Sequence, residues 1–192
     1  LLEREQVVGI DDRRHALARG DELPSHPHGA ALFADISGFT PLTEVLARSL
    51  GPQRGSEELT RILDLVYDAL IIQIHHFGGT VISFSGDAIT CWFDGDDASR
   101  ATTCALAMQA AMKQFVAIEL PDGETAHLAM KVAVALGSVQ RFVVGDPNIL
   151  LLDVMAGVTL DHLAAAEHHA MRGEVILDHA AAAALGRRAH IV

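Results

Sequence analysis

An apolar stripe in the middle of the chain places the strongest limit on its fold. Apolar side chains recur there at steps of three and four residues, the spacing that keeps them on one face of an α-helix; they are Leu59, Ile62, Leu63, Val66, Tyr67, Leu70, Ile71 and Ile74. A helix with an apolar face this wide is stable only when a sheet or another chain covers it. We predict that most of this face is part of the protein core.

Segments on both sides of the stripe have the patterns of strands and helices. Strands are predicted at 30–34, 80–85, 88–93, 127–136, 139–144, 150–154 and 174–177. Helices are predicted at 41–50, from Ser56 to the Gly78-Gly79 pair, at 97–116, at 158–169 and in the last Ala-rich segment. Tight turns at Gly86-Asp87 and Gly137-Ser138 predict two β-hairpins. This order of elements favours an α/β (α+β) fold in which helices flank one sheet.

Polar residues mark the expected starts of the first two helices. Thr40 stands directly before Pro41; a hydroxyl there can cap free helix amides, and proline at the first helical position loses no hydrogen bond. Ser56 is followed by Glu57 and Glu58, whose charges suit the positive end of a helix dipole. We therefore expect helices to begin at Pro41 and at Ser56.

Length and charge limit the class of protein. The 192 residues, 50% of them hydrophobic and 20% charged, are enough for one folded domain. We expect that domain at 28–192, after a lead-in segment at 1–27. A formal net charge of −11 repels polyanions, so no nucleic-acid partner is expected. Polar or charged residues interrupt every long apolar run, so we expect no membrane-spanning segment and no membrane partner.

Two smaller features concern the cellular context. Cys91 and Cys104 are the only cysteines, too few for a disulfide framework, which favours a reducing compartment and a cytoplasmic location. The chain begins with neither Met nor a basic leader before an apolar run, so we expect it to be a piece of a longer protein.

Two aspartates stand where a metal site can form. Asp35 follows a short buried strand, and Asp87 lies at the tip of the predicted hairpin. Mg²⁺ and Mn²⁺ prefer oxygen ligands, and they commonly take one or two carboxylates while water and substrate phosphates complete the shell. Gly38 lets the backbone approach a ligand closely, and the amides of Phe39 and Thr40 point from a helix N-terminus, so a phosphate is the expected guest.

A simpler interpretation is open for each aspartate. Most aspartates in turns accept hydrogen bonds from their own backbone, and Asp35 and Asp87 taken singly fit that role. Their combination with the phosphate-binding turn favours a site for a metal and a nucleotide. Two carboxylates in one place repel each other unless a cation lies between them.

The motifs around these residues resemble those of the class III adenylate and guanylate cyclases. The resemblance lies in Phe33-Ala34-Asp35-Ile36-Ser37-Gly38-Phe39-Thr40 and in the segment from Gly78 through Gly86-Asp87-Ala88, and it extends over roughly 28–178. The segment Gly173-Glu174-Val175-Ile176-Leu177 is similar to the bicarbonate-responsive soluble branch.

The resemblance implies a fold, a dimer and a reaction. The fold would be a palm-like, ferredoxin-like antiparallel sheet, and two domains would dimerise head to tail with active sites in the interface. Asp35, Asp87 and the Ile36 carbonyl would hold two Mg²⁺ (or Mn²⁺) ions, and the turn through Gly38, Phe39 and Thr40 would hold the phosphates of a nucleoside triphosphate. The reaction would convert ATP or GTP to a 3′,5′-cyclic nucleotide and pyrophosphate by in-line attack.

The chain departs from the family at the other active-site positions. Ser83 stands where the resemblance places a purine-selecting Lys, Asp161 where it places an Asn, and Ala165 where it places an Arg. The second purine-selecting residue falls near Val154, with Asp153 beside it. Ser83 and Ala164 stand where the resemblance would place the basic residues of a bicarbonate pocket, so we make no prediction about bicarbonate regulation.

These departures predict a metal-binding half that needs a complementary cyclase domain in cis or in trans. The isolated chain, or a homodimer of it, is then expected to be inactive. The alternative is a non-catalytic cyclase-like domain that binds a nucleotide or dimerises as a regulatory module.

Overall fold

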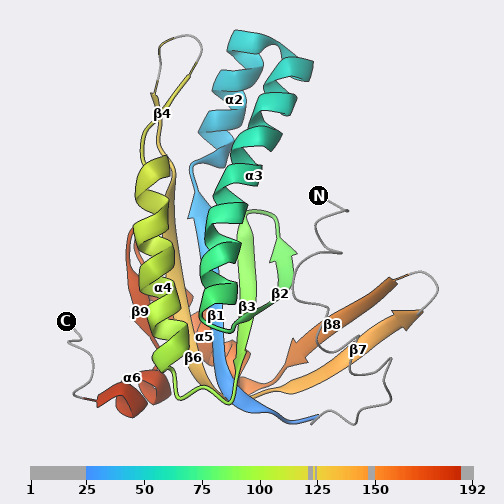
Figure 1. Cartoon of the computed structure of the whole chain (residues 1–192), viewed down its shortest axis with the longest axis vertical. Helices are drawn as coiled ribbons and strands as arrows, with labels where there is room; N and C mark the ends of the chain where they lie inside the picture. Colours follow the sequence, from blue (N-terminus) through green and yellow to red (C-terminus); the bar gives the residue numbers. More distant parts are fainter. Residues whose placement is uncertain (1–24, 121–122, 124, 147–149, 187–192) are drawn as a thin grey trace.

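The structure is a computed structural model that describes residues 25–120, 123, 125–146 and 150–186. A five-stranded sheet forms its centre (Figure 1). The strands are β1 (His28–Ser37), β2 (Thr80–Ser85), β3 (Ala88–Asp94), β4 (Ile118–Glu119), β5 (Thr125–Ala126), β6 (Ala129–Ser138), β7 (Gln140–Asp146), β8 (Leu150–Ala156) and β9 (Val175–Leu177). The helices are α2 (Phe39–Leu50), α3 (Pro52–His76), α4 (Ser99–Met112), the 3₁₀ turn η1 (Lys113–Phe115), α5 (Val158–His169) and α6 (His179–Leu185). Most of the predicted lead-in at 1–27 lies outside the described residues.

The sheet is mainly antiparallel, as predicted. Its strand order is β2-β3-β1-β6-β9. The central strand β1 pairs antiparallel with β3 on one side and with β6 on the other, and only the pairing of β6 with β9 is parallel. The protein is therefore a mixed α+β fold with helices flanking an antiparallel-dominated sheet.

The strand β1 alternates between the two faces of the sheet. Every second residue belongs to the large core under α2, α3 and α4; these residues are Ala30, Leu32, Ala34 and Ile36. Ala31 and Phe33 pack instead in a smaller cluster with Leu163 and Ala166 of α5. Because side chains alternate along a strand, Asp35 belongs to the α5 face of the sheet.

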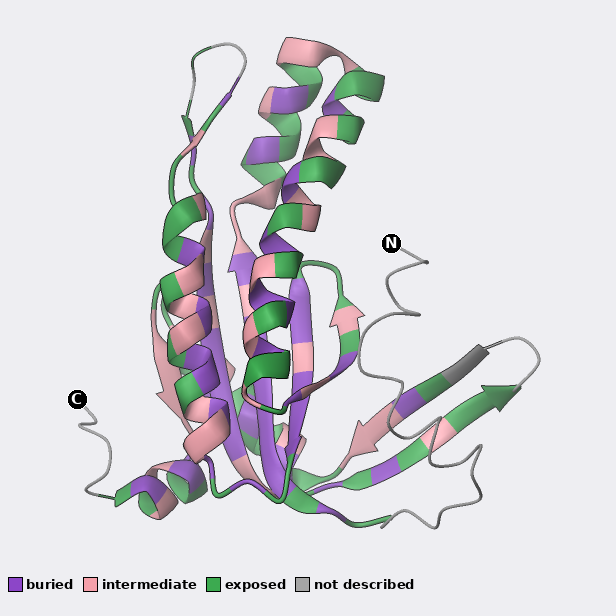
Figure 2. Ribbon diagram, in the orientation of Figure 1, coloured by how far each residue is buried: buried purple, intermediate pink, exposed green. Residues whose placement is uncertain are grey.

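The predicted apolar stripe is confirmed as core. Its innermost residues, Ile62, Val66, Leu70 and Ile74, are buried where α3 packs on the sheet beside α4 (Figures 1 and 2). The opposite face of α3 is exposed. Among the described residues, no helix combines the length and the apolar content that crossing a bilayer requires.

The first two helices begin earlier than predicted. α2 begins at Phe39 with Gly38 as its N-cap residue, so Thr40 lies inside the first turn and makes no capping bond. α3 begins at Pro52 and has no side-chain cap either, which places Ser56 inside the helix. Proline at the first helical position, and not a polar cap, is thus the start signal of α3. The helix predicted at 97–116 is also shorter and ends as η1.

Position 38 requires glycine for two reasons, its backbone conformation and a close neighbouring residue. Its φ is +109°, and a Cβ there would lie 2.2 Å from the backbone oxygen of His127. Replacement Gly38→Ala is therefore expected to lower the free energy of unfolding by at least about 2 kcal/mol, measured by urea denaturation. The control is Gly95→Ala, where φ is +62° but nothing lies within 4 Å of the new Cβ; strain alone there costs about 1–2 kcal/mol. Equal losses in the two variants would contradict the role of the His127 contact.

The predicted hairpin at Gly137-Ser138 is wrong. The strand β6 continues through Ser138, and β7 pairs with β8 in a separate two-stranded sheet. Gly137 does not have a positive φ; a Cβ there would instead meet the Thr159 hydroxyl at 2.5 Å. The glycine therefore allows α5 to approach the sheet closely and does not make a turn.

The strands β7 and β8 form an arm that extends away from the main sheet (Figure 1). A buried ion pair joins the two strands: the Arg141 guanidinium donates to both carboxylate oxygens of Asp153, at 2.9 and 3.1 Å from Nε. The Arg141 amide also donates to the Ser25 carbonyl at 3.0 Å. Phe142, Val144 and Leu152 are exposed apolar residues of the arm.

Candidate metal and nucleotide site

The sequence pattern predicted that Asp35 follows the end of a strand. In the structure Asp35 lies inside β1, near its C-terminal end. It pairs with Ala88 of β3 and with Lys131 of β6. The Lys131 ammonium lies 3.4 Å from the Asp35 carboxylate and forms a second ion pair with Glu167 of α5. The hydrogen bond to Glu167, with a further contribution from Asp35, raises the pKa of Lys131. Lys131 therefore supplies a counter-charge to Asp35 from within the chain.

Asp87 lies in the two-residue turn between β2 and β3. Gly86 before it has φ +64°, which a tight hairpin turn of this kind requires at its first central residue. The Tyr67 hydroxyl of α3 donates to the Gly86 carbonyl at 3.2 Å, and its ring makes an edge contact with Phe84, with centroids 5.4 Å apart. Burial raises the pKa of Tyr67, and the nearby Asp87 charge raises it further. Tyr67 thus holds the turn that presents Asp87.

Ile36 joins the two aspartate-bearing segments. Its amide donates to the Asp87 carbonyl at 3.2 Å. In an antiparallel strand the amide and carbonyl of one residue point to the same neighbouring strand. The Ile36 carbonyl is therefore directed toward the Asp87 turn, while the Ile36 side chain is buried in the core.

The three residues predicted to contact phosphate lie directly after β1 in the chain. Gly38 is the N-cap residue of α2, and Phe39 and Thr40 are its first two residues. No side chain caps this helix end, and Pro41 has no amide proton. Free amides at a helix N-terminus attract anions. Phe39 is half-buried and Thr40 is exposed.

The donor set fits a hard divalent cation whose shell is completed by water and phosphate. Asp35, Asp87 and the Ile36 carbonyl are all oxygen donors, which is the chemistry of Mg²⁺ and Mn²⁺ sites. Asp87 is exposed and Asp35 is half-buried, so water can reach both. Among the described residues no cluster of three or more His, Cys, Asp or Glu side chains is suited to hold a metal on its own.

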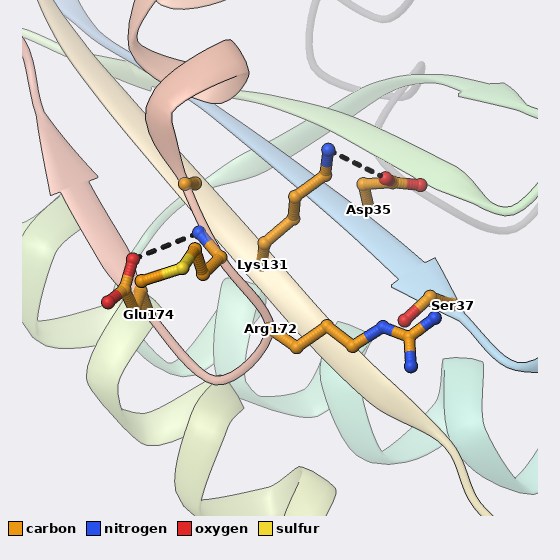
Figure 3. Close-up of a pocket in the computed structure, with 7 residues that line it drawn as sticks. Asp35, Ser37, Lys131, Arg172 and Glu174 are labelled. Carbon is orange, nitrogen blue, oxygen red and sulfur yellow. Dashed lines mark hydrogen bonds and ion pairs between the residues drawn. The ribbon is translucent and has the colours of Figure 1, made fainter.

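Asp35 lines a pocket of about 670 Å³. The residues that line it are Asp35, Ser37, Lys131, Ala170, Met171, Arg172 and Glu174 (Figure 3). Sequence reasoning missed Lys131 and Arg172 as site residues. For Lys131 a signal was available, because a charged residue interrupts an otherwise apolar strand pattern. Arg172 lies in a loop, where no periodic pattern exists to be broken.

The positions that depart from the family have two different surroundings. Ser83, Asp161 and Ala165 are exposed, and none of the three has the side chain that the family resemblance places there. Asp153 is buried and paired with Arg141. It therefore has a structural role in the arm, and it is not available to select a purine.

Comparison with known proteins was made by sequence and by structure. No protein-family model matches the chain. Adenylate cyclase type 10 of Mus musculus is 27% identical over 164 residues and that of Rattus norvegicus is 28% identical over 166 residues, each match covering 82% of this chain. The chain spans 10% of the length of these relatives.

Solved cyclases share the fold. The adenylyl cyclase CyaB from P. aeruginosa has a TM-score of 0.65 at 20% identity and covers 83% of this chain, with 81% of its own chain matched. The guanylyl cyclase Cya2 has a TM-score of 0.67 at 23% identity, covering 86% and 82%. The guanylate cyclase domain of RhGC from Catenaria anguillulae, in complex with GTP, has a TM-score of 0.65 at 17% identity, covering 84% of each. The chain is thus homologous to a segment of adenylate cyclase type 10, and it has the fold of the class III adenylyl and guanylyl cyclase catalytic domains.

Proposed function

We propose that residues 28–192 are the metal-binding half of a nucleotide cyclase that converts ATP or GTP to a 3′,5′-cyclic nucleotide and pyrophosphate. The observation that supports this most is the bond from the Ile36 amide to the Asp87 carbonyl, because it joins both aspartate-bearing segments beside the uncapped end of α2. The relatives are named adenylate cyclases, and one structural neighbour is in complex with GTP. A cytoplasmic location belongs to the same proposal.

Each site residue has a separate task in this proposal. Asp35, Asp87 and the Ile36 carbonyl hold two Mg²⁺ or Mn²⁺ ions, and Phe39 and Thr40 bind phosphate through their amides. Bound divalent cations lower the pKa of the 3′-hydroxyl and offset negative charge on the α-phosphate. Lys131, opposite Asp35 on the same face of the sheet, adds a cation near the phosphates.

The complementary domain supplies what this chain lacks. It provides the purine-selecting residues and the Asn and Arg that steady the ribose and the transition state, and it pairs with this chain head to tail. A regulatory cyclase-like domain without catalysis is the second candidate. Two observations favour it: Ser83, Asp161 and Ala165 stand where the resemblance places Lys, Asn and Arg, and Lys131 gives Asp35 a structural partner without any metal.

Metal binding tests the site directly. Titration of the chain with Mn²⁺ in the presence of a nucleotide, followed by calorimetry, is expected to show binding that Asp35→Asn and Asp87→Asn each weaken by at least about tenfold, because each removes one of two anionic ligands. The matched control is Asp94→Asn, at the other end of β3, which pairs with Gly29 of β1. If both site variants titrate like the parent chain, the metal assignment is wrong.

A further inference from the structure

The turn after α5 places a second cation at the Asp35 pocket. Residues Met171 to Glu174 form a four-residue β-turn, in which the Glu174 amide donates to the Met171 carbonyl at 3.0 Å. Gly173 has φ +87°, as the third residue of a type II turn requires. Arg172 is the second residue of the turn, at its tip.

The turn is tied to its surroundings at several points. The Glu174 carboxylate accepts from the Met171 amide at 2.9 Å, and the Gly173 amide donates to the Met130 carbonyl at 2.8 Å. Gln109 of α4 donates to the Met130 carbonyl at 2.9 Å and to the Glu174 carbonyl at 3.1 Å. These bonds fix the backbone of the turn against β6 and α4. The base of the Arg172 side chain therefore has a defined place.

The two cations of the pocket differ in what they contact. Lys131 is engaged by Asp35 and Glu167. The Arg172 side chain extends from its turn toward Ser37 at the end of β1 (Figure 3). Within the described residues Arg172 makes no hydrogen bond and no ion pair. Its guanidinium donors are therefore available to an anion in the pocket.

We propose that Arg172 binds the terminal phosphates of the nucleoside triphosphate and the pyrophosphate product. This inference rests on the proposed function and names a residue of the same site. A guanidinium presents a planar fork of donors that matches phosphate oxygens in pairs, and a pocket of about 670 Å³ has room for a polyphosphate. This half then holds the phosphate end of the substrate, and the complementary domain holds the base and ribose.

The binding must be local, since the chain as a whole has a formal net charge of −11 and repels polyanions. Calorimetric titration of the full chain with inorganic tripolyphosphate in the presence of Mg²⁺ measures it. Arg172→Gln is expected to weaken binding about tenfold or more, because it removes charge-assisted hydrogen bonds. Arg172→Lys keeps the charge without the fork, so its loss should be smaller. The loss is also expected to shrink as salt concentration rises.

Arg54→Gln is the matched control. Arg54 is an exposed arginine like Arg172. It lies near the start of α3, and the 12-residue helix α2, about 18 Å long, separates it from Ser37. The control is expected to bind tripolyphosphate like the parent chain. A parent chain that does not bind, an unchanged Arg172→Gln, or an equal loss in Arg54→Gln would each overturn the inference.

The same titration separates this inference from the proposed function. In one outcome Arg172→Gln, but not Arg54→Gln, loses affinity for tripolyphosphate, while the complete two-domain protein makes no cyclic nucleotide. This outcome would support the phosphate site and refute the cyclase activity. In the other outcome the two-domain protein forms cyclic nucleotide in a way that depends on Asp35, while Arg172→Gln binds tripolyphosphate like the parent chain. This outcome would support the cyclase activity and refute the role of Arg172.

Discussion

Cyclic nucleotide formation is expected to be undetectable with this chain alone and to appear when a complementary cyclase domain is added. Ser83, Asp161 and Ala165 stand where the family resemblance places Lys, Asn and Arg. A homodimer repeats Asp35 and Asp87 but supplies none of those groups. Loss of one preorganised charge-stabilising group commonly lowers a rate by about 10² to 10³, so several losses together bring turnover below detection.

The measurement is conversion of labelled ATP and of labelled GTP with Mn²⁺, by the chain alone and by a protein that also contains the complementary domain. Asp35→Ala in the longer protein is expected to abolish the activity again, and Asp94→Asn is expected to leave it unchanged. Robust turnover by the chain alone would contradict the half-site proposal. An inactive longer protein whose second domain is intact would favour the regulatory alternative.

Replacement Asp153→Ala is expected to destabilise the β7–β8 arm by about 3–5 kcal/mol, since it removes the carboxylate that pairs with the buried Arg141 guanidinium. The side chains of Arg141 and Asp153 are only 7% and 1% exposed, so solvent does little to screen them. Hydrogen exchange is the measurement that isolates the arm. Amides of β7 and β8 should exchange at least about 10² times faster, because 1.4 kcal/mol corresponds to a factor of ten.

The control removes both charges. Arg141→Met combined with Asp153→Leu removes both members of the ion pair. Its arm is expected to exchange much more slowly than that of Asp153→Ala, because replacing a whole buried ion pair with apolar residues is often neutral or stabilising. Amides of the main sheet serve as an internal reference. If Asp153→Ala leaves exchange in the arm unchanged, the ion pair does not stabilise the arm.

The fold was largely predictable because most elements follow from periodic patterns. The stripe from Leu59 to Ile74 identified α3 and its buried face, and the short apolar runs identified the strands. The errors arose at glycines and helix starts, whose meaning depends on contacts between distant segments. Gly137 has a turn-like neighbour in Ser138, and only the position of Thr159 from α5 reveals why a side chain is excluded.

The candidate site was predictable in part for the same reason. Asp35 and Asp87 belong to local motifs, and their segments do meet in the structure. Their roles as metal ligands stay predictions. Lys131 and Arg172 come from β6 and from the turn after α5, which pairing of distant segments brings to the pocket. Asp153 shows the converse, since only its contact with Arg141 separates a structural aspartate from a functional one.

The central position of β1 also bears on how the chain folds during synthesis. Its partner β3 ends at Asp94 and its other partner β6 ends at Ser138, so 138 − 94 = 44 residues are made between the two. At about 5–20 residues per second this takes about 2 to 9 seconds. During that interval one edge of an apolar strand has unpaired amides and carbonyls, which invite pairing with another nascent chain. A strand that is paired on both sides in the finished protein therefore has an open edge while the chain is being made.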